Sequence, residues 1–346
     1  MVAFICYIDL TNYFLYVTLY RGGCKEMRFV ITGASGHIGN NLVRHINAMD
    51  RDASIISLGR RYVDRELSGT TVTQVVGDIT SVDFLKANIR KDDIVIHSAG
   101  FIDLTGKKFN EAYNINYVAT KNICDVCEEV GVKKFVYIGS VDAIYREDVN
   151  ALITEPDDYY PDLMPDSYSK TKAMASKYVL DRIKANKKFN ANIILPTCVI
   201  GVHDYKPSAV GRIVQGIING KKEIGIKGGY NFVDVMDVCK CIYNSSLSNT
   251  SGQYIVSGHN VTIHEFYDKI NKVLDKKCKP FIIPDWLVYV VMPFVKVLNR
   301  VTLRALKDPH NYTSAKAKKD LGYIATDIDE SVREMVEWFR NKKSKD

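Results

Sequence analysis

The chain has 346 residues, of which 46% are hydrophobic and 25% are charged, a balance typical of soluble globular proteins. This length accommodates one large α/β domain with an added lobe, or two ordinary domains. The formal net charge of +7 comes largely from scattered lysines, which argues against a nucleic-acid partner. Among eight cysteines, Cys124 and Cys127 form one CxxC pair in a helical segment, so we expect no metal site and free thiols in a reducing cytoplasm.

Residues 1–26 form an apolar and aromatic extension. The extension is interrupted by Asp9 and Asn12 and lacks both a basic segment in front and a small-residue cleavage site, unlike a secretory signal. Its length approaches that of a membrane span, so an anchor is an alternative. However, the RGG at 21–23 can be encoded by a purine-rich stretch resembling a bacterial ribosome-binding site. We therefore expect the native protein to start at Met27, with a translated leader before it.

From Met27 onward, short β-branched runs alternate with helical patterns. This alternation predicts an α/β fold, a Rossmann-type doubly wound parallel sheet with helices on both faces. The expected helices include 39–48, 109–130 and 167–185, each with apolar residues at three and four spacing. The expected strands are 28–32, 54–58, 71–76, 93–99, 134–140 and 191–196.

After Pro196 the alternation weakens, which predicts a nucleotide-binding domain over 27–195 and mainly a smaller C-terminal substrate-binding lobe over 196–346. We expect strands near 229–235 and 253–257 to return from this second part to the core sheet. The loop 144–166 is acidic and rich in tyrosine. It is expected to cover the active site and to favour a hydroxylated or neutral ligand.

A glycine-rich turn, TGASGHIG, follows the first strand, with Gly33, Gly36 and Gly39 at regular spacing. Glycines at a strand-to-helix turn let the backbone approach a pyrophosphate, which is stabilised by free N–H groups at the helix N-terminus. The position immediately after the first strand of an alternating pattern makes this signal strong. The turn therefore predicts dinucleotide binding, with Ser35, His37 and Ile38 as further contacts.

The end of the second strand indicates which dinucleotide binds. An NAD site usually places a carboxylate about 20 residues after the glycine loop, to bind the ribose hydroxyls. Here that position is Gly59, and it is followed by Arg60 and Arg61. Two guanidinium groups suit a 2′-phosphate, so NADP(H) is the preferred cofactor and NAD(H) the alternative. The alternative explanation of both arginines is simple exposure to solvent.

The stretch DSYSKTK contains Tyr168 and Lys172, which share one face of a helix. A phenol with a pKa of about 10 is a poor acid at neutral pH, and an adjacent ammonium should lower that pKa. Spacing alone does not make this pair a reaction centre. Ser140, however, ends the preceding strand, where its hydroxyl can hydrogen-bond a carbonyl oxygen, although Ser98 and Asp142 could also reach that pocket.

The glycine loop together with VIHSAG (95–100), YNINYVATKNI (113–123), YIGSVDAIY (137–145) and YSKTK (168–172) resembles the extended short-chain dehydrogenase/reductases. The resemblance spans essentially Met27 to the C-terminus. It implies that Ser140, Tyr168 and Lys172 are catalytic, and that Asn116 supports the lysine through the helix backbone. It also implies cofactor contacts at Asp78, Ile79, Ala99, Gly100, Tyr168, Lys172 and Pro196. The bland alternatives are that Asp78 caps a turn and that Asn116 is a buried polar group.

The stretches 196–220, 228–238 and 314–323 resemble the dihydroflavonol-reductase-like branch of that family. This resemblance implies an oxidoreductase that uses NADPH to reduce a ketone or aldehyde of a small or medium-sized organic substrate. Val199, Tyr205 and Tyr230 become candidate substrate contacts, with core packing as the alternative. A carbonyl or alcohol is then the expected partner, in a cytoplasmic protein for which a homodimer is compatible with the sequence.

Three alternatives stay open. A nucleotide-sugar epimerase or dehydratase would share the tyrosine and lysine, but the missing carboxylate at Gly59 argues against retained NAD. A hydroxysteroid-dehydrogenase-like enzyme is a further alternative. Such relatives dock on membranes, and the apolar stretch 285–298 could do the same. That stretch is short and contains Pro293, so membrane contact is not expected. A non-catalytic NADP-sensing protein is disfavoured because both the tyrosine and the lysine are present.

Overall fold

The structure is a computed structural model that describes residues 27–103, 107–221, 224–276, 281–284, 303 and 306–343. The N-terminal extension and the apolar stretch 285–298 lie outside the described residues, so both predictions about them stay untested. Within the described part of the chain, no helix is long and apolar enough to cross a membrane.

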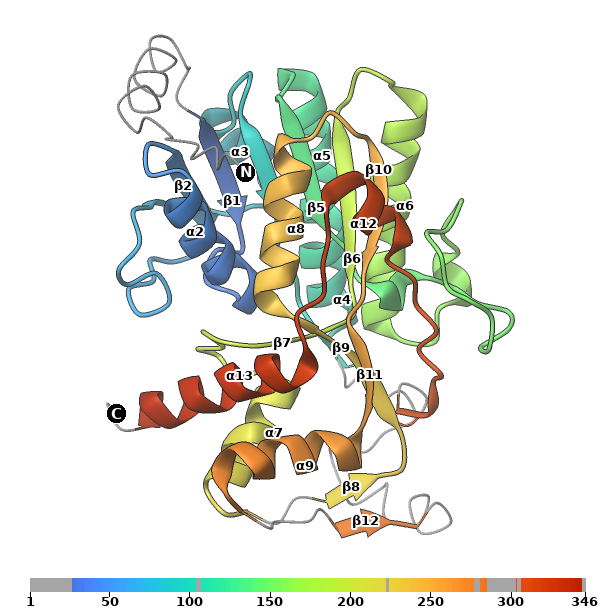
Figure 1. Ribbon diagram of the computed structural model, residues 1–346. Helices are drawn as coiled ribbons and strands as arrows, with labels where there is room; N and C mark the ends of the chain where they lie inside the picture. The colour runs from blue at the N-terminus through green and yellow to red at the C-terminus, as the bar shows by residue number, and fades with distance from the viewer. Residues whose placement is uncertain are drawn as a thin grey trace, which may run out of the picture.

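A seven-stranded parallel sheet forms the centre of the molecule (Figure 1), in the order β10-β6-β5-β4-β1-β2-β3. Its central strands are buried on both faces, which explains the continuous apolar runs in the sequence. The prediction of a Rossmann-type doubly wound sheet is confirmed. The strands are β1 (Arg28–Thr32), β2 (Ser54–Gly59), β3 (Thr73–Val76), β4 (Ile94–His97), β5 (Lys134–Ile138), β6 (Ala191–Pro196) and β10 (Gly252–Val256).

Helices cover both faces of this sheet and enclose one apolar core on each. The core on one face includes side chains from α3 (Val82–Asn88), α5 (Ala119–Val130) and α6 (Ser167–Ala185). The core on the other includes side chains from α2 (His37–Met49), α8 (Val235–Leu247) and α12 (Ala315–Leu321). Before α5, the chain forms a short helix α4 (Phe109–Ala112) and a π-helical turn, Tyr113–Val118.

The second lobe lies below the main sheet in Figure 1. Its three-stranded sheet has the order β11-β9-β7, with β7 (Cys198–Ile200), β9 (Gly229–Asp234) and β11 (His259–Thr262). An apolar cluster joins this sheet to α7 (Ala209–Ile218), α9 (Ile263–Leu274) and α13 (Ile328–Lys343). A short parallel pair, β8 (Ile224–Ile226) with β12 (Phe281–Ile283), completes the described strands. Strands β6 and β10 of the main sheet lead at their carboxyl ends directly into β7 and β11, so the lobe adjoins that edge.

The two predicted returning strands behave differently. The strand expected near 253–257 is β10, which pairs with β6 in the main sheet. The strand expected near 229–235 is β9, and its assignment to the core sheet was wrong. Strand β9 instead lies between β7 and β11, the continuations of β6 and β10 beyond the carboxyl edge of the main sheet, and its backbone pairs there.

Candidate active site

The glycine loop between β1 and α2 has the tight geometry that only glycine permits. Gly33 has a φ of 75°, and a Cβ atom built on it would lie 2.5 Å from the backbone nitrogen of Ala99. A Cβ atom on Gly39 would lie 2.1 Å from the carbonyl oxygen of Gly33. The loop therefore packs directly against the end of β4, with its backbone open to a ligand on its outer side.

The N-terminus of α2 is suited to bind an anion. Its N-cap residue is Gly36, no side chain caps it, and its first turn contains no acidic residue. The first backbone N–H groups of a helix have no intrahelical acceptor and, with the helix dipole, favour a phosphate. Ser35 and His37 beside them are half-buried, whereas Ile38 packs against the apolar core. The loop thus fits the pyrophosphate of a dinucleotide.

The segment after β2 provides the positive charge predicted for this region. Arg60 and Arg61 are both exposed. Gly77 donates its N–H to the carbonyl oxygen of Gly59, which brings the turn after β3 beside the end of β2. In this turn Asp78 is exposed and accepts from the backbone of Thr80, while Ile79 is buried in the core. Asp78 therefore caps its turn, and an adenine contact stays a prediction for both residues.

Helix α6 presents the predicted catalytic pair. Asp166 caps the helix by accepting from the backbone N–H groups of Tyr168 and Ser169, at 2.9 Å each. Tyr168 is half-buried, and the nearby side chain of Ser140 acts to lower the pKa of its phenol. Ser140 ends the β5 segment and donates to the carboxylate of Asp142 at 3.0 Å. Tyr168 and Ser140 therefore lie together at the carboxyl edge of the main sheet.

Lys172 lies one helical turn further, with its side chain buried. Its amine donates to the carbonyl oxygen of Ile138 at 2.8 Å and to the hydroxyl of Tyr137 at 3.4 Å. The ammonium also lies over the Tyr137 ring, 5.0 Å from its centroid. Burial lowers the pKa of Lys172 to about 8, although the Asp142 carboxylate opposes this effect. The lysine is thus bound to strand β5 as well as to its own helix.

The expected lowering of the Tyr168 pKa was wrong for this arrangement of side chains. Burial, and then the negative charge of Asp142, raise the pKa of the phenol above its ordinary value, while the hydrogen bond with Ser140 opposes them. The physical reason is that the Lys172 amine is directed to Ile138 and Tyr137. Tyr168 is therefore firmly protonated at neutral pH.

Asn116 lies in the π-helical turn before α5 and is 1% exposed. Its side chain accepts from the backbone N–H of Phe101 at 2.7 Å and donates to the Phe101 carbonyl oxygen at 2.8 Å. It also donates to the hydroxyl of Thr171, the neighbour of Lys172, at 3.0 Å. A π-helical turn frequently marks a functional position. Here it lets one side chain join the segment after β4 to helix α6.

The segment after β4 completes this part of the site. Ala99 is half-buried and Gly100 is exposed. A Cβ atom on Gly100 would lie 3.6 Å from both the Lys172 amine and the Asn116 carbonyl oxygen, so its backbone faces both residues. Ser98 donates its hydroxyl to the carbonyl oxygen of Thr32, which disfavours it as a competitor of Ser140. Pro196, the last residue of β6, is buried and pairs with Val256.

The three candidate substrate residues do not lie together. Tyr230, in β9, lies next to His310, and burial followed by the nearby Cys198 and Asp142 raises its pKa, so it lies near the predicted catalytic residues. Val199 packs against the apolar core beside α2 and α8. Tyr205 packs between α2 and α13, and no contact joins it to the catalytic residues in the described part of the chain. Only Tyr230 is favoured as a substrate contact.

Beside Asp142, which the sequence already named as able to reach the pocket, the structure shows an ion pair that the sequence did not single out. Asp142 is exposed, and its charge acts on Tyr168 and Lys172. Arg146 forms a bidentate ion pair with Asp308, which in turn accepts from the backbone of His310 at 2.8 Å. The short spacing from Ser140 was the sequence signal for Asp142. No local sequence motif predicts the ion pair between Arg146 and Asp308.

The family model described as the 3-beta hydroxysteroid dehydrogenase/isomerase family matches residues 30–210, which is more than half of the chain. This chain belongs to that family. Its enzymes are extended short-chain dehydrogenase/reductases, so the resemblance predicted from the sequence motifs is confirmed.

Full-length relatives agree with this assignment. Sterol demethylase protein B of Methylococcus capsulatus is 24% identical over 330 residues, covering 91% of this chain and 99% of that protein. A putative dihydroflavonol 4-reductase of Synechocystis sp. is 23% identical and covers 90% of this chain and 94% of that protein. The human sterol-4-alpha-carboxylate 3-dehydrogenase, decarboxylating, is 24% identical, covering 92% of this chain and 89% of that protein.

Solved structures show the same fold. The crystal structure of gox2253 superposes with a TM-score of 0.79 at 23% identity, covering 92% of this chain and 99% of that one. MoeE5, solved in complex with UDP-glucose and NAD, superposes with a TM-score of 0.72 at 19% identity, covering 91% and 99%. The fold therefore continues through the second lobe.

Proposed function

We propose that this chain is an NADP(H)-dependent oxidoreductase that reduces a ketone or aldehyde of a small or medium-sized organic substrate, with Tyr168 as the proton donor. One observation carries the proposal. Tyr168 and Ser140 lie near each other at the carboxyl edge of the sheet, where Lys172 is bound to the carbonyl oxygen of Ile138, and the glycine loop leads into the uncapped helix α2 at the same edge. Ligands of open α/β sheets bind at this edge.

Each side chain of the site has a separate role at the substrate oxygen. A bound nicotinamide cofactor supplies the hydride. Tyr168, whose pKa is raised, holds a proton for the developing alkoxide, and Ser140 offers a second hydrogen bond to the same oxygen once its hydroxyl turns away from Asp142. Lys172 remains mostly protonated at neutral pH, since its pKa is about 8, and contributes positive charge. Asn116 fixes the backbone at Phe101 and the turn of α6 that carries the lysine.

The preference for NADP(H) is supported by charge at the end of β2. Gly59 stands where a carboxylate would bind the ribose hydroxyls and repel a 2′-phosphate. Arg60 and Arg61 follow it and are both exposed, so they can reach a phosphate at the rim of the site. NAD(H) is the alternative cofactor, and the relatives solved with NAD keep it open.

The substrate class is supported by the surroundings of Tyr168. The exposed carboxylate of Asp142 disfavours an anionic group close to the reacting carbon, so a neutral carbonyl is favoured. The names of several relatives refer to sterols. A second candidate function is therefore oxidation of a ring hydroxyl on a hydroxysteroid-like substrate by the same residues in reverse, favoured by the match to the family model.

The proposal is tested by following NADPH consumption with neutral ketones, aldehydes, ketosteroids and nucleotide sugars, and NADP⁺ reduction with 3β-hydroxysteroids. We expect turnover of a neutral ketone or of its alcohol, with NADPH favoured over NADH. Conversion of a nucleotide sugar without net consumption of cofactor would instead identify an epimerase or dehydratase. Binding of NADPH without turnover of any substrate would favour a sensing protein.

A further inference from the structure

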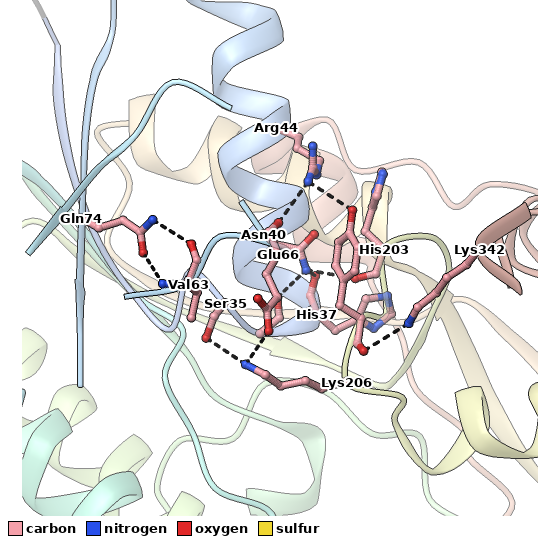
Figure 2. Close-up of polar contacts among 12 residues, drawn as sticks. Ser35, His37, Asn40, Arg44, Val63, Glu66, Gln74, His203, Lys206 and Lys342 are labelled. Carbon is pink, nitrogen blue, oxygen red and sulfur yellow. Dashed lines mark hydrogen bonds and ion pairs between the residues drawn. The ribbon is translucent and has the colours of Figure 1, made fainter. Parts of the chain in front are cut away.

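A segment of the second lobe lies across the beginning of helix α2. Residues 201–206 follow β7, and Figure 2 shows them against the glycine loop and α2. The side chain of Asn40 donates to the carbonyl oxygen of His203 at 3.1 Å, and Asn41 donates to that of Val202 at 2.9 Å. The ring of His203 donates back to Asn41 at 2.8 Å. These contacts fix the segment on the nucleotide-binding part of the fold.

Lys206, at the end of this segment, holds its amine above the glycine loop. The amine lies 3.0 Å from a carboxylate oxygen of Glu66 and 3.4 Å from the hydroxyl of Ser35 (Figure 2). The Glu66 side chain is 12% exposed, whereas that of Lys206 is 47% exposed. The lysine thus approaches from the solvent side and contacts the loop expected to hold the pyrophosphate.

Glu66 belongs to the segment after β2, which is held firmly in place. Arg44 of helix α2 donates to the backbone carbonyl oxygens of Glu66 and Ser68, at 3.0 Å each. Further along, Gln74 pairs through its side chain with the backbone of Val63 (Figure 2). Glu66 therefore lies on the part of a dinucleotide site where the substituents of the adenosine ribose are distinguished.

The charges around Glu66 are mostly positive. Although burial raises its pKa, the hydrogen bond from Lys206 and the charge of Arg61 prevail and lower it. Arg60 is exposed on the same segment, beside Arg61. One carboxylate thus faces several cations, and it holds the Lys206 amine beside the segment that carries Arg60 and Arg61. A carboxylate and a phosphate repel each other, so the lysine can pair with the phosphate only by exchanging partners.

We propose that Lys206, a residue of the second lobe, binds the 2′-phosphate of NADP(H) by exchanging its ion pair with Glu66 for one with the phosphate. The second lobe would then contribute to the choice between NADP(H) and NAD(H), beside the arginines that follow β2. This inference rests on the proposed NADP(H) dependence and adds a residue from a different part of the fold.

The test measures dissociation constants of NADPH, NADH and 2′,5′-ADP by fluorescence or calorimetry. Lys206→Gln should raise the constants for NADPH and 2′,5′-ADP at least about tenfold, because a charge-assisted hydrogen bond is lost, and change that for NADH less than about twofold. Lys206→Arg should retain most of the affinity. Glu66→Gln should lower the constant for NADPH, because it removes the competing carboxylate. Lys342→Gln is the matched control, since Lys342 donates to the carbonyl oxygen of Tyr205 at 3.3 Å in the same cluster.

The outcomes separate this inference from the proposed function. Equal weakening of NADPH and NADH by Lys206→Gln would place the lysine at the pyrophosphate and overturn the 2′-phosphate assignment. Unchanged dinucleotide affinities in Lys206→Gln, or weaker NADPH binding by Glu66→Gln, would overturn the proposal and show that the ion pair is only structural. If the unmodified protein bound neither dinucleotide, the proposed function itself would fail. If it bound NADPH and Lys206→Gln did not change that affinity, only the inference would be contradicted.

Discussion

The amine of Lys172 donates a hydrogen bond to the carbonyl oxygen of Ile138 at 2.8 Å. This bond joins helix α6 to the end of strand β5, two positions before Ser140 in the sequence. Because the helix also carries Tyr168, the three predicted catalytic residues are fixed relative to one another by the backbone of the sheet. The relationship also explains why the lysine does not lower the Tyr168 pKa in this arrangement.

Replacing Asn116 tests whether the π-helical turn supports the site. Asn116→Ala should lower the free energy of unfolding by about 2 kcal/mol, because three hydrogen bonds of this buried side chain, two to the backbone of Phe101 and one to the Thr171 hydroxyl, are lost. At a temperature where the variant is still folded, kcat should also fall. Urea unfolding measures the first effect and steady-state kinetics the second. Asn122→Ala, which removes one bond to Thr80, is the control and should have a smaller effect.

Asp142 should set the pH dependence of reduction. Its negative charge raises the pKa of Tyr168 and opposes the lowering of the Lys172 pKa. Asp142→Asn removes that charge, so both pKa values should fall. Since Lys172, whose pKa is about 8, loses its positive charge as pH rises through that value, the alkaline limb of kcat should move to lower pH. Asp162→Asn, which changes an exposed carboxylate paired with Lys170, should leave the profile in place. If the alkaline limb of kcat did not move in Asp142→Asn, the proposed effect of the Asp142 charge on the pKa values would be contradicted.

The main features of the fold and the central residues of the site follow from local sequence signals. Alternating apolar runs predicted the parallel sheet, because strands buried on both faces need continuous apolar residues. The glycine spacing predicted the turn around Gly33, since close backbone contacts exclude a side chain there. The positions of Tyr168 and Lys172 near a helix start, and of Ser140 after a strand, could be predicted locally, whereas their catalytic roles came from the resemblance to a family and stay predictions.

The remaining features depend on contacts between distant segments. Strand β9 carries the same apolar signal whether it joins the main sheet or the lobe, and only its pairing with β7 and β11 assigns it to the lobe. The ion pair of Arg146 with Asp308 and the contact of Lys206 with Glu66 each join segments far apart in the chain. The direction of the Lys172 amine depends on Ile138 and Tyr137, so the pKa of Tyr168 could not be predicted from helical spacing.

Stability should rise with pH above neutrality because of Lys134. This side chain is fully buried, donates to Asn190 at 2.7 Å, and burial lowers its pKa from 10.5 to about 7. Between these two values the unfolded chain binds more protons than the folded protein, so the free energy of unfolding increases with pH. Lys134→Met lacks this contribution. Between about pH 7 and about pH 10, the Tm of the wild type should rise relative to the Tm of Lys134→Met. Tm values that change in parallel with pH in both proteins would contradict the assignment.

The most direct test of the central claim compares turnover by Tyr168→Phe and Tyr178→Phe. Both residues lie on α6, but the Tyr178 hydroxyl donates to Asp125 on α5, away from Ser140. Tyr168→Phe should reduce kcat by about 10²–10⁴-fold with NADPH affinity kept, because general acid catalysis is lost. Tyr178→Phe should remain active. Equal kcat values for Tyr168→Phe and the wild type, at unchanged cofactor affinity, would contradict the assignment of Tyr168 as the proton donor.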